Sequence, residues 1–136
     1  MNWKRFFGAA AAVFLVGMAM GFVIHGQLLE ADYRNLGPIM RTPQDAQAYF
    51  PSMLLAFVAF TFAFVWLYAK GVEDKPWLGQ GLRFALATWL FGAVSVFLTY
   101  YAVQPLPASL VCKQIGFELV DFLLLGIVVA AIYRKS

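Results

Sequence analysis

The sequence has little of the chemistry that metal and redox sites need. Its 136 residues include one cysteine, Cys112, and one histidine, His25. A single cysteine excludes an internal disulfide, a C-x-x-C redox motif and a cysteine metal cluster. A single histidine excludes a multi-histidine metal or haem site within one copy, although two copies, or His25 with carboxylates, could still bind a metal. We predict no cofactor and no metal.

Charged residues are also scarce. Asp, Glu, Lys and Arg make up 12% of the chain, hydrophobic residues make up 62%, and the mean hydropathy is +0.75. The Lys and Arg residues form no basic stripe that would bind nucleic acid, and they stand at the ends of apolar segments, where they set orientation in a membrane. This composition predicts a polytopic membrane protein whose partner is the lipid bilayer, with no nucleic-acid partner.

Four apolar segments are each long enough to span a bilayer core of roughly 30 Å. They cover about residues 6–25, 50–69, 82–103 and 114–133. A long loop, a short charged turn and a proline-containing connection join them. We predict an all-α fold, a single membrane domain over residues 1–136, built as an integral membrane four-helix bundle that runs up-down-up-down. Lys4 and Arg5 before the first segment are also typical of a signal peptide, but the apolar run continues to Ile24 and favours an uncleaved span.

The distribution of basic residues predicts how the bundle is oriented. If the N-terminus is cytoplasmic, seven Lys and Arg residues lie on the inner side and three on the outer side. The inner set is Lys4, Arg5, Lys70, Lys75, Arg83, Arg134 and Lys135, and the outer set is Arg34, Arg41 and Lys113. The positive-inside rule therefore predicts that both termini are cytoplasmic, in an inner membrane.

Small residues recur at helical spacing on two of the segments. Gly17, Gly21 and His25 are four residues apart, which puts them on one helix face and allows another helix to approach the two glycines closely. The third segment has a longer stripe, formed by Gly81, Ala85, Thr88, Gly92, Ser95 and Thr99. This stripe predicts that the third helix is the most buried of the four, with Gly92 at a helix contact.

The last segment carries two acidic residues, Glu118 and Asp121, three positions apart and so on one helix face. A charge inside a bilayer is costly, so both should face other helices or a wet cavity. His25 and Arg41 are predicted at a similar depth. One interpretation is a structural ion-paired plug in which Arg41 or Lys113 pairs with Asp121. The other is a ligand-binding or proton-relay site formed by His25, Arg41, Glu118 and Asp121.

The pattern His25-Gly26-x-Leu28-Leu29-x-x-x-Tyr33, with Arg41 beyond it and Pro105-x-Pro107 before the last segment, resembles small bacterial four-span inner-membrane proteins. This resemblance implies four helices in a bacterial inner membrane. It implies no activity, since none is established for proteins of this kind.

Three functions remain open from the sequence. The first is a non-enzymatic component, either an accessory or assembly subunit of a larger membrane complex or a small-ligand-binding protein. The second is a proton-linked transporter that acts as a homo-oligomer, because four helices rarely enclose a transport site alone. The third is a membrane enzyme with an acid/base pair at lipid depth. No residue is predicted to be catalytic.

Overall fold

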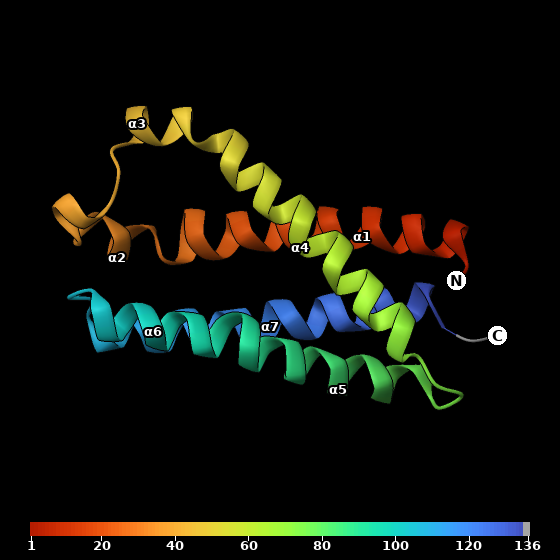
Figure 1. Ribbon diagram of the computed structural model, residues 1–136. Helices are drawn as coiled ribbons and strands as arrows, with labels where there is room; N and C mark the ends of the chain where they lie inside the picture. The colour runs from red at the N-terminus through yellow and green to blue at the C-terminus, as the bar shows by residue number, and fades with distance from the viewer. Residues whose placement is uncertain (135–136) are drawn as a thin grey trace.

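The computed structural model describes residues 1–134, and every regular element in this range is a helix (Figure 1). Four helices are long and apolar enough to cross a membrane: Trp3–Leu28, Phe50–Gly71, Trp77–Val103 and Ala108–Ile132. Consecutive spans run in opposite directions, so the two termini lie at the same end (Figure 1). The prediction of four helical spans is confirmed, and it indicates a multi-pass membrane protein.

Three of the spans begin earlier than predicted, and the first span starts at Trp3 and not at residue 6. The third comprises α5 (Trp77–Trp89), η3 (Leu90–Val94) and α6 (Ser95–Val103), so it starts at Trp77 and not at residue 82. The fourth is α7 (Ala108–Ile132), which starts directly after Pro107 and not at residue 114. The polar residues before each apolar run therefore continue the helix. Counted from Ala108 at 1.5 Å a residue, Glu118 lies about 15 Å and Asp121 about 20 Å along the axis of α7.

The first span and the loop after it change helix type near His25. α1 (Trp3–Val23) continues into η1 (Ile24–Leu28), a π-helical turn. The loop then forms α2 (Glu30–Arg34), the 3₁₀ turn η2 (Gly37–Ile39) and α3 (Pro43–Ala48). Thr42 caps the start of α3, since its hydroxyl accepts a hydrogen bond of 3.2 Å from the Asp45 backbone N–H, and Pro43 occupies the first helical position.

The helix at the centre of the bundle is α7. About a third of its apolar 18-residue stretch is buried, whereas 22% of the corresponding stretch of the third span is buried. The prediction that the third helix is the most buried is therefore wrong. α4 (Phe50–Gly71) crosses the bundle obliquely and diverges from it toward α3 (Figure 1). All the buried residues of α4 lie in its second half, at Thr61, Phe64, Val65 and Tyr68.

The small-residue stripe of the third span is interrupted by a π-helical turn. Gly81, Ala85 and Thr88 are buried as a helical stripe requires, but the next buried residue is Ala93, five positions on. The turn η3 adds one residue and rotates the rest of the helix. Ser95 and Thr99 are therefore exposed, and their hydroxyls donate to carbonyls of their own helix, those of Phe91 and Ser95.

The glycines predicted to pack helices meet side chains and not backbone. A Cβ added to Gly17 would lie 3.8 Å from Leu125 Cδ2, an ordinary contact. A Cβ on Gly21 would lie 3.2 Å from Phe57 Cζ, and one on Gly92 would lie 3.1 Å from Phe122 Cζ. Gly21 and Gly92 therefore leave room for phenylalanine rings.

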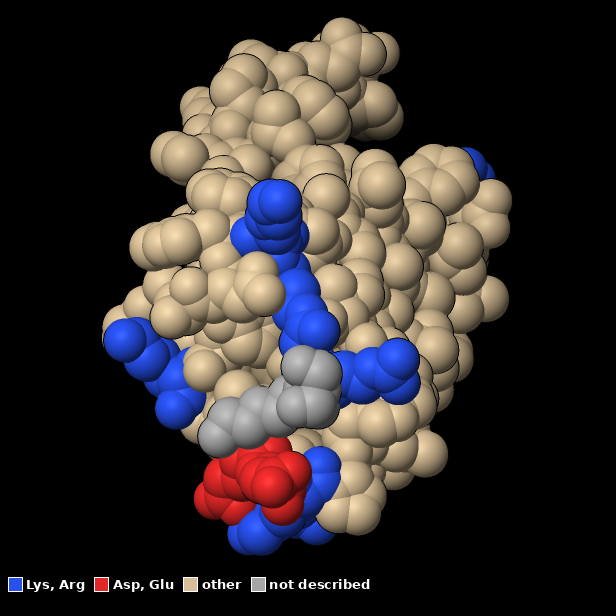
Figure 2. Space-filling model, turned by 90° about the vertical axis from the view of Figure 1, so that its right-hand side faces the viewer, with Lys and Arg blue, Asp and Glu red and all other residues tan. Residues whose placement is uncertain are grey.

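The two ends of the bundle differ in charge. The end that carries both termini and the connection between α4 and α5 shows many Lys and Arg side chains, and its acidic side chains gather in one place (Figure 2). In the described chain this end holds Lys4, Arg5, Lys70, Lys75, Arg83 and Arg134, with the acids Glu73 and Asp74. Lys135, which belongs to the same predicted group, lies outside the described residues. The other end is balanced, with Arg34, Arg41 and Lys113 beside Glu30, Asp32 and Asp45.

Candidate functional site

His25 connects the first loop to the last span. Its Nε2 lies 2.8 Å from Glu118 Oε1, and its Nδ1 lies 2.6 Å from the Tyr33 hydroxyl oxygen. The π-helical turn η1 carries His25, α2 carries Tyr33 and α7 carries Glu118. The Glu118 side chain is 14% exposed and that of His25 is 37% exposed. Two neighbouring segments and the last span, 93 residues on, therefore meet at one imidazole, and His25 points toward an acid of the last span as one interpretation of the sequence predicted.

Tyr33 also contacts Gln114, whose Nε2 donates to the Tyr33 hydroxyl oxygen over 3.2 Å. With that donor in place, the Tyr33 hydroxyl can donate to Nδ1 of a neutral His25, and Nε2–H can donate to Glu118. This order satisfies all three bonds and fixes the imidazole tautomer. Burial raises the pKa of Tyr33 above its ordinary value of 10.0; the bond from Gln114 opposes this shift, and the charges of Glu118 and Asp32 add to it.

Asp121 is the buried acid of the site. It is 8% exposed, and its Oδ1 has no hydrogen-bond partner among residues 1–134. A buried carboxyl oxygen without a partner is unfavourable, because it loses water and gains nothing in exchange. Asp121 is therefore a group whose polar contacts the described chain leaves incomplete, as is Gln114, whose Oε1 also has no partner there.

The cations predicted to pair with Asp121 lie elsewhere. Lys113 Nζ contacts both carboxylate oxygens of Asp32, at 3.0 and 3.1 Å. Arg41 is exposed and donates to Asp45 over 2.8 Å, which raises the pKa of the guanidinium. The predicted pairing of Arg41 or Lys113 with Asp121 is wrong, because both cations find acids at the surface, where neither has to be desolvated.

A cavity of about 260 Å³, which we name the carboxylate pocket, opens beside the acids. Its polar lining consists of His25, Glu118 and Asp121, and the remainder is apolar. The apolar lining comprises Gly21, Ala56, Phe57, Phe60, Gly92, Ala93, Phe97 and Phe122. Both π-helical turns of the described chain border the pocket, η1 through His25 and η3 through Gly92 and Ala93. Such turns recur at functional sites, because they displace the helix locally and redirect side chains.

The structure thus brings three of the four predicted site residues together, His25, Glu118 and Asp121, and leaves out Arg41. In residues 1–134, no group of three or more His, Cys, Asp or Glu side chains is placed to hold a metal ion. What the pocket offers a ligand is one carboxylate with free acceptor capacity, one carboxylate shared with an imidazole, and aromatic faces.

Sequence reasoning missed two polar residues of the site, Tyr33 and Gln114. Gln114 is buried and opens the predicted fourth segment, so a polar residue at the start of an apolar run was the available signal. Tyr33 follows His25 by eight residues across a change of helix type, and no periodicity connects them.

No protein-family model, no curated protein and no solved structure matches this chain.

Proposed function

We propose that this chain is a non-enzymatic ligand-binding protein of a bacterial inner membrane, with both termini in the cytoplasm. Its ligand is a small lipid-soluble organic cation, which binds in the carboxylate pocket. The orientation is supported by the excess of Lys and Arg at the end that carries the termini. The observation that carries the binding function is the buried Asp121 carboxyl group, which lines a cavity and has an oxygen without a protein partner.

Charge favours a cationic ligand. Within a bilayer, acids pair with a cation or face water, and here Glu118 is occupied by His25 while both nearby basic residues pair with surface acids. A positive group beside Asp121 would supply the missing charge. The rings of Phe57, Phe60, Phe97 and Phe122 line the same cavity and offer faces for a cation–π contact.

Size and position favour a small ligand that enters from the lipid. The cavity of about 260 Å³ lies just below the range of roughly 300–1,000 Å³ that is usual for small-molecule sites. One wall is formed by Ala56, Phe57 and Phe60 of α4, the helix that diverges from the bundle (Figure 1). The carboxylate pocket therefore lies at the side of the bundle, where a lipid-soluble molecule can reach it from the bilayer.

The test compares two ligands of the same shape. Benzyltrimethylammonium is the cationic probe, and neopentylbenzene is its neutral isostere. Binding to the full chain in detergent should favour the cation, and Asp121→Asn should weaken that binding by at least about tenfold, or 1.4 kcal/mol. Asp45→Asn removes the same charge from an exposed surface pair and should leave affinity unchanged.

Equal binding of the two probes, or equal effects of the two variants, would contradict the proposal. Asp121→Asn keeps the volume of the side chain, so the protein should remain folded by circular dichroism and size-exclusion chromatography. If it unfolds instead, Asp121 serves the stability of the fold and the binding proposal loses its support.

A proton-linked transporter that works as a homo-oligomer is a second candidate, favoured by the bonded series Tyr33–His25–Glu118. These groups extend from the first loop to the wall of the pocket and can relay a proton. In proteoliposomes, a pH gradient should then drive uptake of radiolabelled benzyltrimethylammonium. Glu118→Gln should abolish this uptake but weaken equilibrium binding less than Asp121→Asn does. Gradient-independent uptake would reject transport and leave binding as the function.

A further inference from the structure

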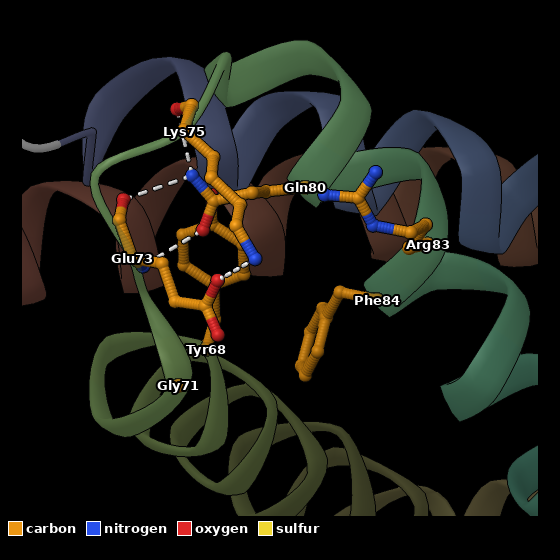
Figure 3. Close-up of a pocket in the computed structure, with 7 residues that line it drawn as sticks. All are labelled: Tyr68, Gly71, Glu73, Lys75, Gln80, Arg83 and Phe84. Carbon is orange, nitrogen blue, oxygen red and sulfur yellow. Dashed lines mark hydrogen bonds and ion pairs between the residues drawn. The ribbon is translucent and has the colours of Figure 1, made fainter.

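A second cavity lies at the opposite end of α4, where the chain turns into α5. It has a volume of about 450 Å³ and is lined by residues of both helices and of the turn between them (Figure 3). We name it the turn pocket and define it by Tyr68, Gly71, Lys75, Gln80, Arg83 and Phe84, together with Glu73. No residue of the carboxylate pocket takes part in it.

The turn that forms this pocket is held by one side chain. Gln80 accepts a hydrogen bond of 2.8 Å from the Glu73 backbone N–H, and its Nε2 donates to the carbonyls of Glu73 and Lys75 at 2.9 and 2.8 Å. Figure 3 shows these bonds closing the turn on one side of the pocket. The pocket is thus preformed, which lowers the entropy cost of binding.

The turn pocket has a net positive charge. Lys75 forms an ion pair with Glu73, whereas Arg83 forms no ion pair with any residue in the range 1–134. The guanidinium of Arg83 extends from α5 toward the part of the pocket where Gln80 and Lys75 lie (Figure 3). One cation and one neutralised pair therefore face the same space, which favours an anion.

Tyr68, another residue that lines the pocket, carries a buried hydroxyl. Tyr68 is 3% exposed and its hydroxyl oxygen has no partner within the described chain, although the ring is well packed and makes an edge contact with Phe84 at 5.2 Å. A phenolic O–H that is buried without a partner is an available hydrogen-bond donor. Arg83 and Tyr68 together provide a charged and a neutral donor to one anion.

We infer that the turn pocket binds the phosphate group of an anionic phospholipid. Arg83 binds phosphate oxygens through its forked guanidinium, and Tyr68 donates its hydroxyl to the same group. The location fits a headgroup, because the pocket joins the last turn of one span to the first turns of the next. Nearby, the Lys70 ammonium lies 5.8 Å from the ring centroid of Trp66, a pair typical of the membrane–water boundary.

The experiment measures lipid retention by native mass spectrometry on the full chain in detergent, titrated with phosphatidylglycerol and separately with phosphatidylcholine. The wild-type protein should retain phosphatidylglycerol preferentially. Arg83→Gln should weaken this binding by at least about tenfold, and Tyr68→Phe, which keeps the packed ring, by about two- to tenfold. Lys4→Gln removes the same charge from an exposed position at the same end and should change affinity little.

Two results would overturn the inference. If Lys4→Gln lowers retention as much as Arg83→Gln, the lipid responds to diffuse charge and not to this pocket. If inorganic phosphate alone binds with the same dependence on Arg83, and the two lipids are retained equally, the source is free phosphate and not a headgroup. All three variants leave the carboxylate pocket intact, and circular dichroism checks that each remains folded.

Discussion

Gly81 of α5 and Gly126 of α7 lie so close that a Cβ added to either would stand 2.5 Å from the carbonyl oxygen of the other. Two helix backbones are in contact there, with the Cβ atoms of Ala85 and Ala130 filling the space around them. Small residues allow this approach, and it is the tightest helix contact that the glycines of the described chain make.

Gly81→Ala should therefore destabilise the protein. The added methyl group meets backbone, which cannot move aside as a flexible side chain would, so we expect a loss of about 1–3 kcal/mol. Gly17→Ala is the control, since its Cβ would make only ordinary contacts and alanine favours a helix by up to about 1 kcal/mol. Thermal unfolding in detergent measures both. Equal midpoints for the two variants would show that α5 and α7 can separate without cost.

The bond between His25 and Glu118 should couple the two residues energetically. His25→Ala leaves a largely buried carboxylate without its partner and should cost about 1–3 kcal/mol of unfolding free energy. Glu118→Gln alone should cost a similar amount, but the double variant should cost less than the sum, with a coupling of about 1–2 kcal/mol. Strictly additive losses in the double-mutant cycle would mean that the 2.8 Å contact does not stabilise the bundle.

The raised pKa of Tyr33 predicts a loss of stability at high pH. Burial favours the protonated hydroxyl in the folded state, so this contribution is complete below pH 10 and disappears as the pH rises through the folded pKa. In an absorbance titration near 295 nm, Tyr33→Phe should have one fewer late-ionising phenol than the wild-type protein. The variant should also lose less stability between pH 9 and 11 than the wild-type protein does. If its alkaline unfolding is unchanged, Tyr33 is not the group responsible.

Hydrophobicity was sufficient to predict the four spans, because a segment in lipid must satisfy its own backbone and be apolar over its whole length. It was not sufficient for their boundaries. Lys113 and the residues before it read as a loop, yet the helix begins at Ala108, since a long basic side chain can extend to the surface from inside a helix.

Rotation of the helices was the weaker part of the prediction. The positions of His25 and Glu118 along their helices follow from the sequence, and their contact was one of two open interpretations. The predicted buried face of the third span was wrong beyond Thr88, because a π-helical turn has no sequence signature that periodicity detects. Contacts of the loop, such as Tyr33 with His25 or Lys113 with Asp32, depend on how that loop folds back, which spacing along the chain does not specify.

Removing one residue from η3 tests whether this turn shapes the carboxylate pocket. Deleting Phe91, which is 61% exposed, shortens the step from Thr88 to Ala93 to four residues, so a regular α-helix can present both to α7. We expect the thermal midpoint to change little, because the buried face is preserved and an exposed side chain is lost. Binding of benzyltrimethylammonium should weaken, since Gly92 and Ala93 would no longer be displaced beside Asp121.

Deleting Leu98 is the matched control for that variant. Leu98 is also half exposed and lies in α6, after the last residue of the third span that lines the pocket, so its loss shifts only the exposed end of the helix. Probe binding should then remain at the wild-type level. If both deletions weaken binding equally, the effect comes from shortening the third span, and η3 has no separate part in the site. If deletion of Phe91 leaves affinity intact, the pocket does not depend on the π-helical turn, and the widened backbone there serves packing against Phe122 alone.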